Sequence, residues 1–160
     1  MIQNKAVEFA KIKDAGSIAR LSRDLIEFDL PWTWQPPKVA RCIYDKSHNV
    51  VVHRSNGRVA GFGIMAYELQ HAHLCLFAVD SSMQLRGIGH SILWWLEETA
   101  LVAGIDKIYL ETRLQNESAR CFYQNRGYAN TEKLLNYYSG REHAIRMTKV
   151  LRKTPDITPQ

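Results

Sequence analysis

The stretch VDSSMQLRGIGHSILWW, residues 79–95, places a glycine-containing turn between an apolar run and a segment with helical spacing. Gly87 and Gly89 flank Ile88, so the backbone can approach a ligand without a Cβ in the way. Amides just before a helix point outward and carry partial positive charge, and Arg86 adds a full charge. Such a turn suits a diphosphate, and a tight strand-to-helix corner is the competing interpretation.

Neither of the two common nucleotide-binding loops fits this turn. A dinucleotide-binding loop needs a third glycine where this chain has Ile92. A P-loop needs Gly-Lys followed by Ser or Thr, whereas this chain has Gly89, His90 and Ser91. The turn is therefore a phosphate site of another kind or a purely structural corner.

Length and composition favour one globular domain. The chain has 160 residues, of which 46% are hydrophobic and 23% are charged, and this balance is typical of globular proteins. We expect a single domain over residues 1–152 and a flexible tail over residues 153–160. The basic residues behind the net charge of +5 are scattered, so the sequence does not favour nucleic-acid binding.

The sequence shows no targeting or membrane-spanning pattern. The first residues lack an apolar run of signal-peptide length, and Glu97 and Glu98 interrupt the apolar segment after the glycine turn. The three cysteines, Cys42, Cys75 and Cys121, are far apart and odd in number, which suits a reducing compartment. We therefore expect a cytoplasmic protein with no membrane partner.

Hydrophobic periodicity predicts alternating strands and helices. Strands are expected over residues 6–13, 49–54, 59–68, 71–79, 107–113, 128–138 and 142–151, and helices over residues 14–28, 38–45, 88–103 and 117–126. Asp14 and Asn116 are the expected helix caps, Phe28 and Ala103 are placed on buried helix faces, and the three prolines of residues 29–37 predict a loop. The order β-α-α-β-β-β-α-β-α-β-β predicts an α/β domain.

Three side chains downstream of the turn share one face of a predicted helix. Asn116, Ala119 and Tyr123 are three and four residues apart. Asn116 can hydrogen-bond an amide-bearing ligand, Ala119 leaves room for a ligand chain, and the Tyr123 phenol can donate a proton. A packed aromatic ring with its hydroxyl at the surface is the alternative for Tyr123.

Together these two patterns resemble the GNAT acetyltransferase superfamily. Its phosphate motif, Q/R-x-x-G-x-G/A, matches QLRGIG at residues 84–89. Its second motif, N-x-x-A-x-x-x-Y followed by G-F or G-Y, matches Asn116, Ala119, Tyr123, Gly127 and Tyr128. The sequence is most similar to the RimI-type enzymes, which acetylate the N-terminal alanine of a ribosomal protein, at LPW (30–32), FAVD (77–80), LETR (110–113) and NYYSGREHAIRM (136–147). It departs from them at residues 32–38 and at His143, where that group usually has an acidic residue.

The resemblance implies a mixed, mostly antiparallel central sheet flanked by helices, with two splayed parallel strands that form the acetyl-CoA site. The pantetheine and thioester would meet the backbone of residues 77–79, and the amides of residues 84–90 would hold the pyrophosphate. The expected cofactor-binding residues are Phe77, Ala78, Val79, Gln84, Leu85, Arg86, Gly87, Ile88, Gly89, His90 and Asn116.

The resemblance also assigns catalytic residues. Tyr123 is the candidate acid for the leaving thiolate, although transfer from a phenol of pKa about 10 to a thiolate of pKa about 8.5 runs uphill by roughly 2 kcal/mol. Glu111 matches the RimI-type catalytic glutamate and is the first candidate for the base, and Glu68 is the second. A solvent-facing or Arg-paired glutamate is the structural alternative for Glu111.

The acceptor is an amine, most simply a protein N-terminus, and Trp32, Trp34, Tyr137 and Tyr138 are expected to line its site. No metal is expected, because the pair His71 and His73 has no third ligand at a familiar spacing. No cysteine has an assigned activating group, which favours direct transfer over an acetyl-cysteine intermediate. A small amine or amino acid as acceptor, a CoA-binding module without turnover, and a homodimer are the alternatives left open.

Overall fold

The computed structural model describes residues 6–151, and the tail predicted over residues 153–160 lies outside them. A seven-stranded sheet has the order β1-β2-β3-β4-β5-β7-β6. The single domain over residues 1–152 stays a prediction, because both of its ends lie outside the described residues. The strands are β1 (Val7–Phe9), β2 (His48–Ser55), β3 (Arg58–Tyr67), β4 (His71–Val79), β5 (Lys107–Arg113), β6 (Ala129–Tyr138) and β7 (Glu142–Val150). The helices are α1 (Ala15–Leu25), α2 (Pro36–Tyr44), α3 (Ile88–Val102) and α4 (Glu117–Gln124), with single 3-10 turns at Ile12–Asp14 and Ser81–Met83.

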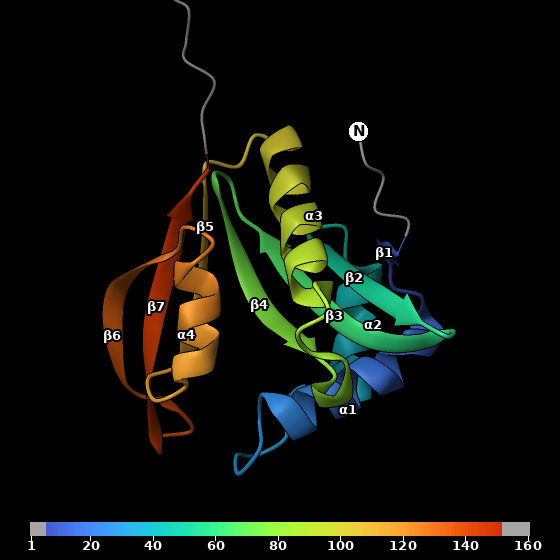
Figure 1. Ribbon diagram of the computed structural model, residues 1–160, viewed down its shortest axis with the longest axis horizontal. Helices are drawn as coiled ribbons and strands as arrows, with labels where there is room; N and C mark the ends of the chain where they lie inside the picture. The colour runs from blue at the N-terminus through green and yellow to red at the C-terminus, as the bar shows by residue number, and fades with distance from the viewer. Residues whose placement is uncertain (1–5, 152–160) are drawn as a thin grey trace, which may run out of the picture.

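The element order confirms the predicted alternation, and the helices cover both faces of the sheet. Helices α3 and α4 lie on the face toward the viewer in Figure 1, and α1 and α2 lie on the opposite face. Each face has its own core, because successive strand residues point to opposite sides. Within β2, Val51 belongs to the core under α3, whereas Val50 and Val52 belong to the core under α1 and α2.

One parallel pair breaks the antiparallel pattern of the sheet and positions the site. Strands β4 and β5 pair only from His71 to His73, which lie opposite Lys107 to Tyr109. Beyond His73 the two strands diverge, as Figure 1 shows between the β4 and β5 labels. Beside this point β4 bulges, because the residues before and after Cys75 pair with consecutive residues of β3. The splayed parallel strands implied by the resemblance are therefore confirmed.

The β2–β3 turn and the first residues of α2 follow local backbone preferences. Asn56 and Gly57 join β2 to β3 with φ values of 51° and 76°, the left-handed conformations that a two-residue hairpin turn requires. Pro36 and Pro37 belong to the first turn of α2 and not to a loop, since the first helical positions need no amide donor.

Three expectations for the helices are wrong. Helix α1 ends at Leu25, so Phe28 lies beyond it and is exposed. The side chain of Asp14 does not cap α1, because its carboxylate accepts from the Lys11 amide at 2.8 Å and from Arg54 at 2.7 Å. Ala103 lies in the exposed last turn after α3, where the helix has run past the edge of the core.

Candidate active site

A cavity of about 910 Å³ occupies the gap between β4 and β5. This volume lies in the range of ligand sites. Its wall combines segments that are far apart in the chain: the glycine turn, α4, β5, the segment after α1, and the end of β6. The splayed strands thus leave an opening that neighbouring elements line from both faces of the sheet.

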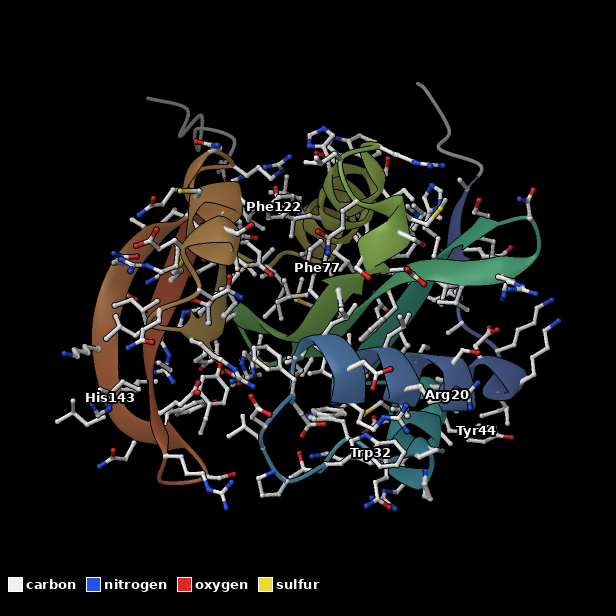
Figure 2. All side chains as sticks on the ribbon, turned by 60° about the horizontal axis from the view of Figure 1, so that its bottom comes forward. Arg20, Trp32, Tyr44, Phe77, Phe122 and His143 are labelled. Atoms are coloured by element: carbon white, nitrogen blue, oxygen red, sulfur yellow. The ribbon has the colours of Figure 1, made fainter. Side chains whose placement is uncertain are left out.

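Most of the residues expected to bind acetyl-CoA line this cavity. They are Phe77, Ala78, Val79, Gln84, Leu85, Gly87, Ile88, Gly89, His90 and Asn116. Arg86 is the exception, since only its neighbours in the turn line the wall. Phe77 from β4 and Phe122 from α4 reach toward each other with ring centroids 5.6 Å apart (Figure 2). We call this half of the cavity the donor side.

The two glycines of the turn are favoured for different reasons. Gly87 precedes α3 with a φ of 78°, a left-handed conformation that is strained for any residue with a Cβ. Gly89 lies in the first turn of α3, where a Cβ would come within 3.3 Å of the Phe122 ring. The first amides of α3 have no acceptor within the helix and carry its positive dipole end. An extended anionic ligand can therefore approach the main chain at this turn.

Helix α4 presents Asn116, Ala119 and Tyr123 to the cavity, as their spacing predicted. The Asn116 side chain caps the helix, because its Oδ1 accepts from the Ala119 amide at 3.2 Å. The Tyr123 ring is buried among Phe77, Phe122 and Tyr128. Burial, and to a lesser degree the nearby Tyr138, raise the pKa of Tyr123, so its hydroxyl is a neutral donor at neutral pH.

Glu111 is engaged through both carboxylate oxygens. One accepts from Arg146 at 2.9 Å, and the other lies 2.6 Å from Nε2 of His73. The Glu111 side chain is only 6% exposed. Burial raises its pKa, but His73 and Arg146 outweigh burial and hold the pKa below its usual range. Taken by itself, Glu111 is a weak base.

His73 was considered from the sequence only as a possible metal ligand, and its place in this site was missed. It lines the cavity, stacks on Tyr109 with ring centroids 4.5 Å apart, and bonds Glu111 on the neighbouring strand. Its place could be found only from the register of the parallel strands, which sets His73 opposite Tyr109. The order of elements along the chain does not reveal that register. Glu68, the second candidate base, accepts from the Tyr109 hydroxyl at 2.8 Å and does not line the cavity.

The other half of the cavity, which we call the acceptor side, takes its wall from the segment after α1 and the end of β6. Trp34, Tyr137 and Tyr138 line it as expected. Trp32 does not: its Nε1 donates to the Ala19 carbonyl at 3.2 Å, and its ring packs on the core under α1 (Figure 2). The prediction for Trp32 is therefore wrong, because its indole N–H and its ring are both engaged with α1 and the core under it.

Two buried charged residues hold the acceptor side together. Arg113 of β5 donates to the carbonyl oxygens of Ile26 at 2.8 Å and Phe28 at 2.6 Å. Glu27 accepts from the amides of Thr33 at 2.9 Å and Trp34 at 3.2 Å. The Arg113 bonds fix the segment after α1 against β5 across more than eighty positions of the chain, and the Glu27 bonds hold the segment's own turn.

His143 does not belong to the wall of the cavity. Nδ1 of His143 accepts from the Asn136 amide at 2.9 Å, and this departure from the RimI-type pattern lies away from the cavity (Figure 2).

Within residues 6–151, no cluster of three or more His, Cys, Asp or Glu side chains could hold a metal. Over the same range, no helix combines the length and apolar character of a membrane span.

Comparisons with known proteins agree with this geometry. The acetyltransferase (GNAT) family matches residues 19–128. An uncharacterized N-acetyltransferase of Methanocaldococcus jannaschii is 29% identical over 145 residues, which cover 86% of each chain. The [ribosomal protein bS18]-alanine N-acetyltransferase of Escherichia coli K12 is 35% identical over 95 residues, 58% of this chain and 64% of that enzyme.

Solved structures share the fold. The crystal structure of the ribosomal-protein-S18-alanine N-acetyltransferase from Escherichia coli superimposes with a TM-score of 0.82 at 24% identity, covering 95% of this chain and 97% of the other. The acetyltransferase yncA from Salmonella typhimurium, solved with acetyl-CoA, gives a TM-score of 0.76 at 17% identity over 95% and 98% of the two chains.

Proposed function

This chain belongs to the acetyltransferase (GNAT) family, and from that premise we propose that it transfers acetyl from acetyl-CoA directly to the N-terminal amine of a protein. The shape of the acceptor side carries the proposal. Phe28 and Tyr137 line the cavity but remain 47% and 45% exposed, so this end opens to solvent. An open mouth admits a chain that extends beyond the reacting amine, whereas a pocket for a small amine would enclose it.

The chemistry around Glu111 also favours an N-terminal amine. An α-amino group of pKa about 8 is roughly a tenth neutral at pH 7, whereas a lysine of pKa about 10.4 is less than a thousandth neutral. Because His73 and Arg146 lower the pKa of Glu111, this site offers little driving force for deprotonating a lysine. An acceptor that is already partly neutral suits such a base.

On the donor side, we assign acetyl-CoA to the residues predicted for it. When bound, acetyl-CoA supplies an activated acetyl group. Main-chain amides of residues 77–79 hold the thioester end, and those of residues 84–90 hold the pyrophosphate, with Arg86 contributing through its amide. The open backbone at Gly87 and the close approach at Gly89 fit an extended anionic ligand. Asn116, at the N-terminal end of α4, supplies a side-chain amide that can hydrogen-bond this ligand.

Two side chains are assigned to proton handling. The buried Tyr123 hydroxyl keeps its proton at neutral pH and donates to the leaving sulfur. Its raised pKa favours a hydrogen bond to the sulfur over complete proton transfer. Glu111 accepts the amine proton through a water or through the His73 ring that it orients.

Transfer to a small amine is the competing function. It required Trp32 and Trp34 to close an aromatic pocket, but the Trp32 ring packs against α1.

The three cysteines are free, which suits a reducing compartment and supports our proposal of a cytoplasmic enzyme.

Acetyl-CoA turnover against a panel of acceptors tests the proposed function. We expect N-terminal peptides to be acetylated at rates at least ten times those of polyamines and free amino acids. Matched peptides with a blocked N-terminus and one internal lysine are the control, and we expect them to be inactive. Turnover confined to the small amines would reject the N-terminal acceptor.

A further inference from the structure

Cys75, His73 and Glu111 form a connected row on the wall of the cavity, which we call the Cys75 triad. Sγ of Cys75 lies 3.7 Å from Nδ1 of His73, and Nε2 of His73 lies 2.6 Å from Glu111. Arg146 holds the second Glu111 oxygen at 2.9 Å, which fixes the carboxylate against His73. A thiol, an imidazole and a carboxylate in this order are the arrangement that activates a nucleophilic cysteine.

The fold brings Cys75 to the point where the acetyl donor is expected. Cys75 is the extra residue of the bulge in β4, and bulges redirect side chains. The bulge follows His73, the last residue of β4 that pairs with β5, so Cys75 lies where the strands separate. The same cavity is lined by Phe77 on the donor side and by Tyr123.

His73 is set up to take the thiol proton. In the neutral ring, Nε2–H donates to Glu111 and the lone pair of Nδ1 faces Cys75, so a proton taken from the thiol makes His73 an imidazolium held by Glu111. The thiol also lies 3.5 Å from the main-chain carbonyl oxygen of His73, but that oxygen cannot accept a proton outright. Burial lowers the pKa of His73, yet the hydrogen bonds to Cys75 and Glu111 outweigh burial and raise this pKa to about 9.

The other two cysteines provide an internal contrast. Cys42 is buried in α2, and burial raises the pKa of its thiol. Cys121 is exposed on α4 and does not line the cavity. Among the described residues, only Cys75 combines a place in the cavity wall with a contact to a histidine.

We propose that Cys75 accepts the acetyl group of acetyl-CoA by thioester exchange when no amine occupies the acceptor side. This activity rests on the proposed acetyl-CoA site and goes beyond transfer to an amine. Nδ1 of His73 takes the thiol proton, Sγ bonds to the acetyl carbonyl carbon, and the bond from that carbon to the CoA sulfur breaks. His73 then returns the proton to the CoA sulfur. One thioester replaces another, so the exchange needs no oxidant or reductant and is reversible.

The test incubates the full chain with acetyl-CoA alone and follows its intact mass. We expect a gain of one acetyl group, which peptide mapping places on Cys75. Neutral hydroxylamine or excess free CoA should remove it, as expected for a thioester. Cys121→Ser should still be labelled, and Cys75→Ala should not. His73→Gln can keep a hydrogen bond to Glu111 but lacks the base, so labelling should slow about a hundredfold.

Calorimetry measures the binding of acetyl-CoA to each variant. A variant that no longer binds acetyl-CoA has lost its fold and is left out of the comparison. Absence of acetyl on Cys75 in protein that binds acetyl-CoA would overturn the proposal. Equal labelling of Cys121 would also overturn it, because acetylation would then be an unassisted surface reaction. The peptide assay on the same preparation is a separate readout. Labelled Cys75 without peptide acetylation would reject the N-terminal acceptor and leave the thioester exchange standing.

Discussion

The donor and acceptor sides of the cavity are built in different ways. The donor side comes from one continuous strand, turn and helix together with one face of α4, and its glycine turn leaves the main chain open to the cavity. On the acceptor side, Arg113 of β5 holds the segment after α1 and lies 5.9 Å from the Tyr138 ring at the end of β6, while Glu27 holds that segment's own fold. The donor side is therefore built from a local motif, whereas the acceptor side depends on contacts between segments far apart in the chain.

The largest effect is expected where the two sides meet, at Tyr123. Tyr123→Phe removes the donor to the leaving sulfur, so kcat should fall about a hundredfold while the KM for acetyl-CoA changes much less. Steady-state kinetics checks this. Tyr128→Phe is the matched control, since Tyr128 is a buried neighbour whose hydroxyl bonds Glu97. An unchanged kcat in Tyr123→Phe would remove Tyr123 from the mechanism.

A donor-side variant should act on acetyl-CoA alone. Gly89→Val pushes a side chain toward the Phe122 ring, and relieving that overlap narrows the donor side. The KM for acetyl-CoA should rise about thirtyfold, with the KM for the peptide altered less than threefold. Gly16→Ala is the control, because its added Cβ meets only the flexible end of Arg20. A larger change in the peptide KM would break the division between the two sides.

An acceptor-side variant should show the reverse pattern. Arg113→Lys keeps the charge but cannot reproduce the fork of bonds to Ile26, Phe28 and Glu142. The segment after α1 should loosen, and the KM for the peptide should rise about tenfold, by the loss of roughly 1.4 kcal/mol. Arg23→Lys, which alters an exposed pair with Asp24, is the control. Equal changes in both KM values would show that the two sides are coupled.

The smallest effect is expected in the pH dependence of protein stability. It arises from the His73–Glu111 pair, which lies between the donor and acceptor sides. Because folding raises the pKa of His73 from 6.5 to about 9, its charge stabilises the fold below pH 6.5. That contribution is lost as the pH rises toward 9. Denaturant unfolding should therefore show the stability of the wild type relative to His73→Gln falling by about 1 kcal/mol between pH 6 and pH 9.5.

Local sequence patterns were sufficient to predict the order of the helices and strands and most of the residues that line the donor side. Strand alternation, the Asn56–Gly57 turn and the Asn116 cap each depend on residues close in sequence, and the structure confirms them. Predictions failed where an element's end or direction depended on its surroundings. Phe28 fits the helical spacing of α1 but lies past its end, and Trp32 points into the core although Trp34 faces the cavity.

The chain by itself determined the strand-turn-helix at residues 77–95 and the α4 face, because φ preferences, caps and side-chain spacing act within a few residues. Only the tertiary structure decided the partners of Glu111 and the place of Cys75 beside His73. Those contacts depend on the parallel register of β4 and β5 and on a bulge, which arise from packing across the whole sheet. Glu111, far from His73 and Cys75 along the chain, joins them in one connected triad because β4 and β5 lie side by side at His73 before they separate.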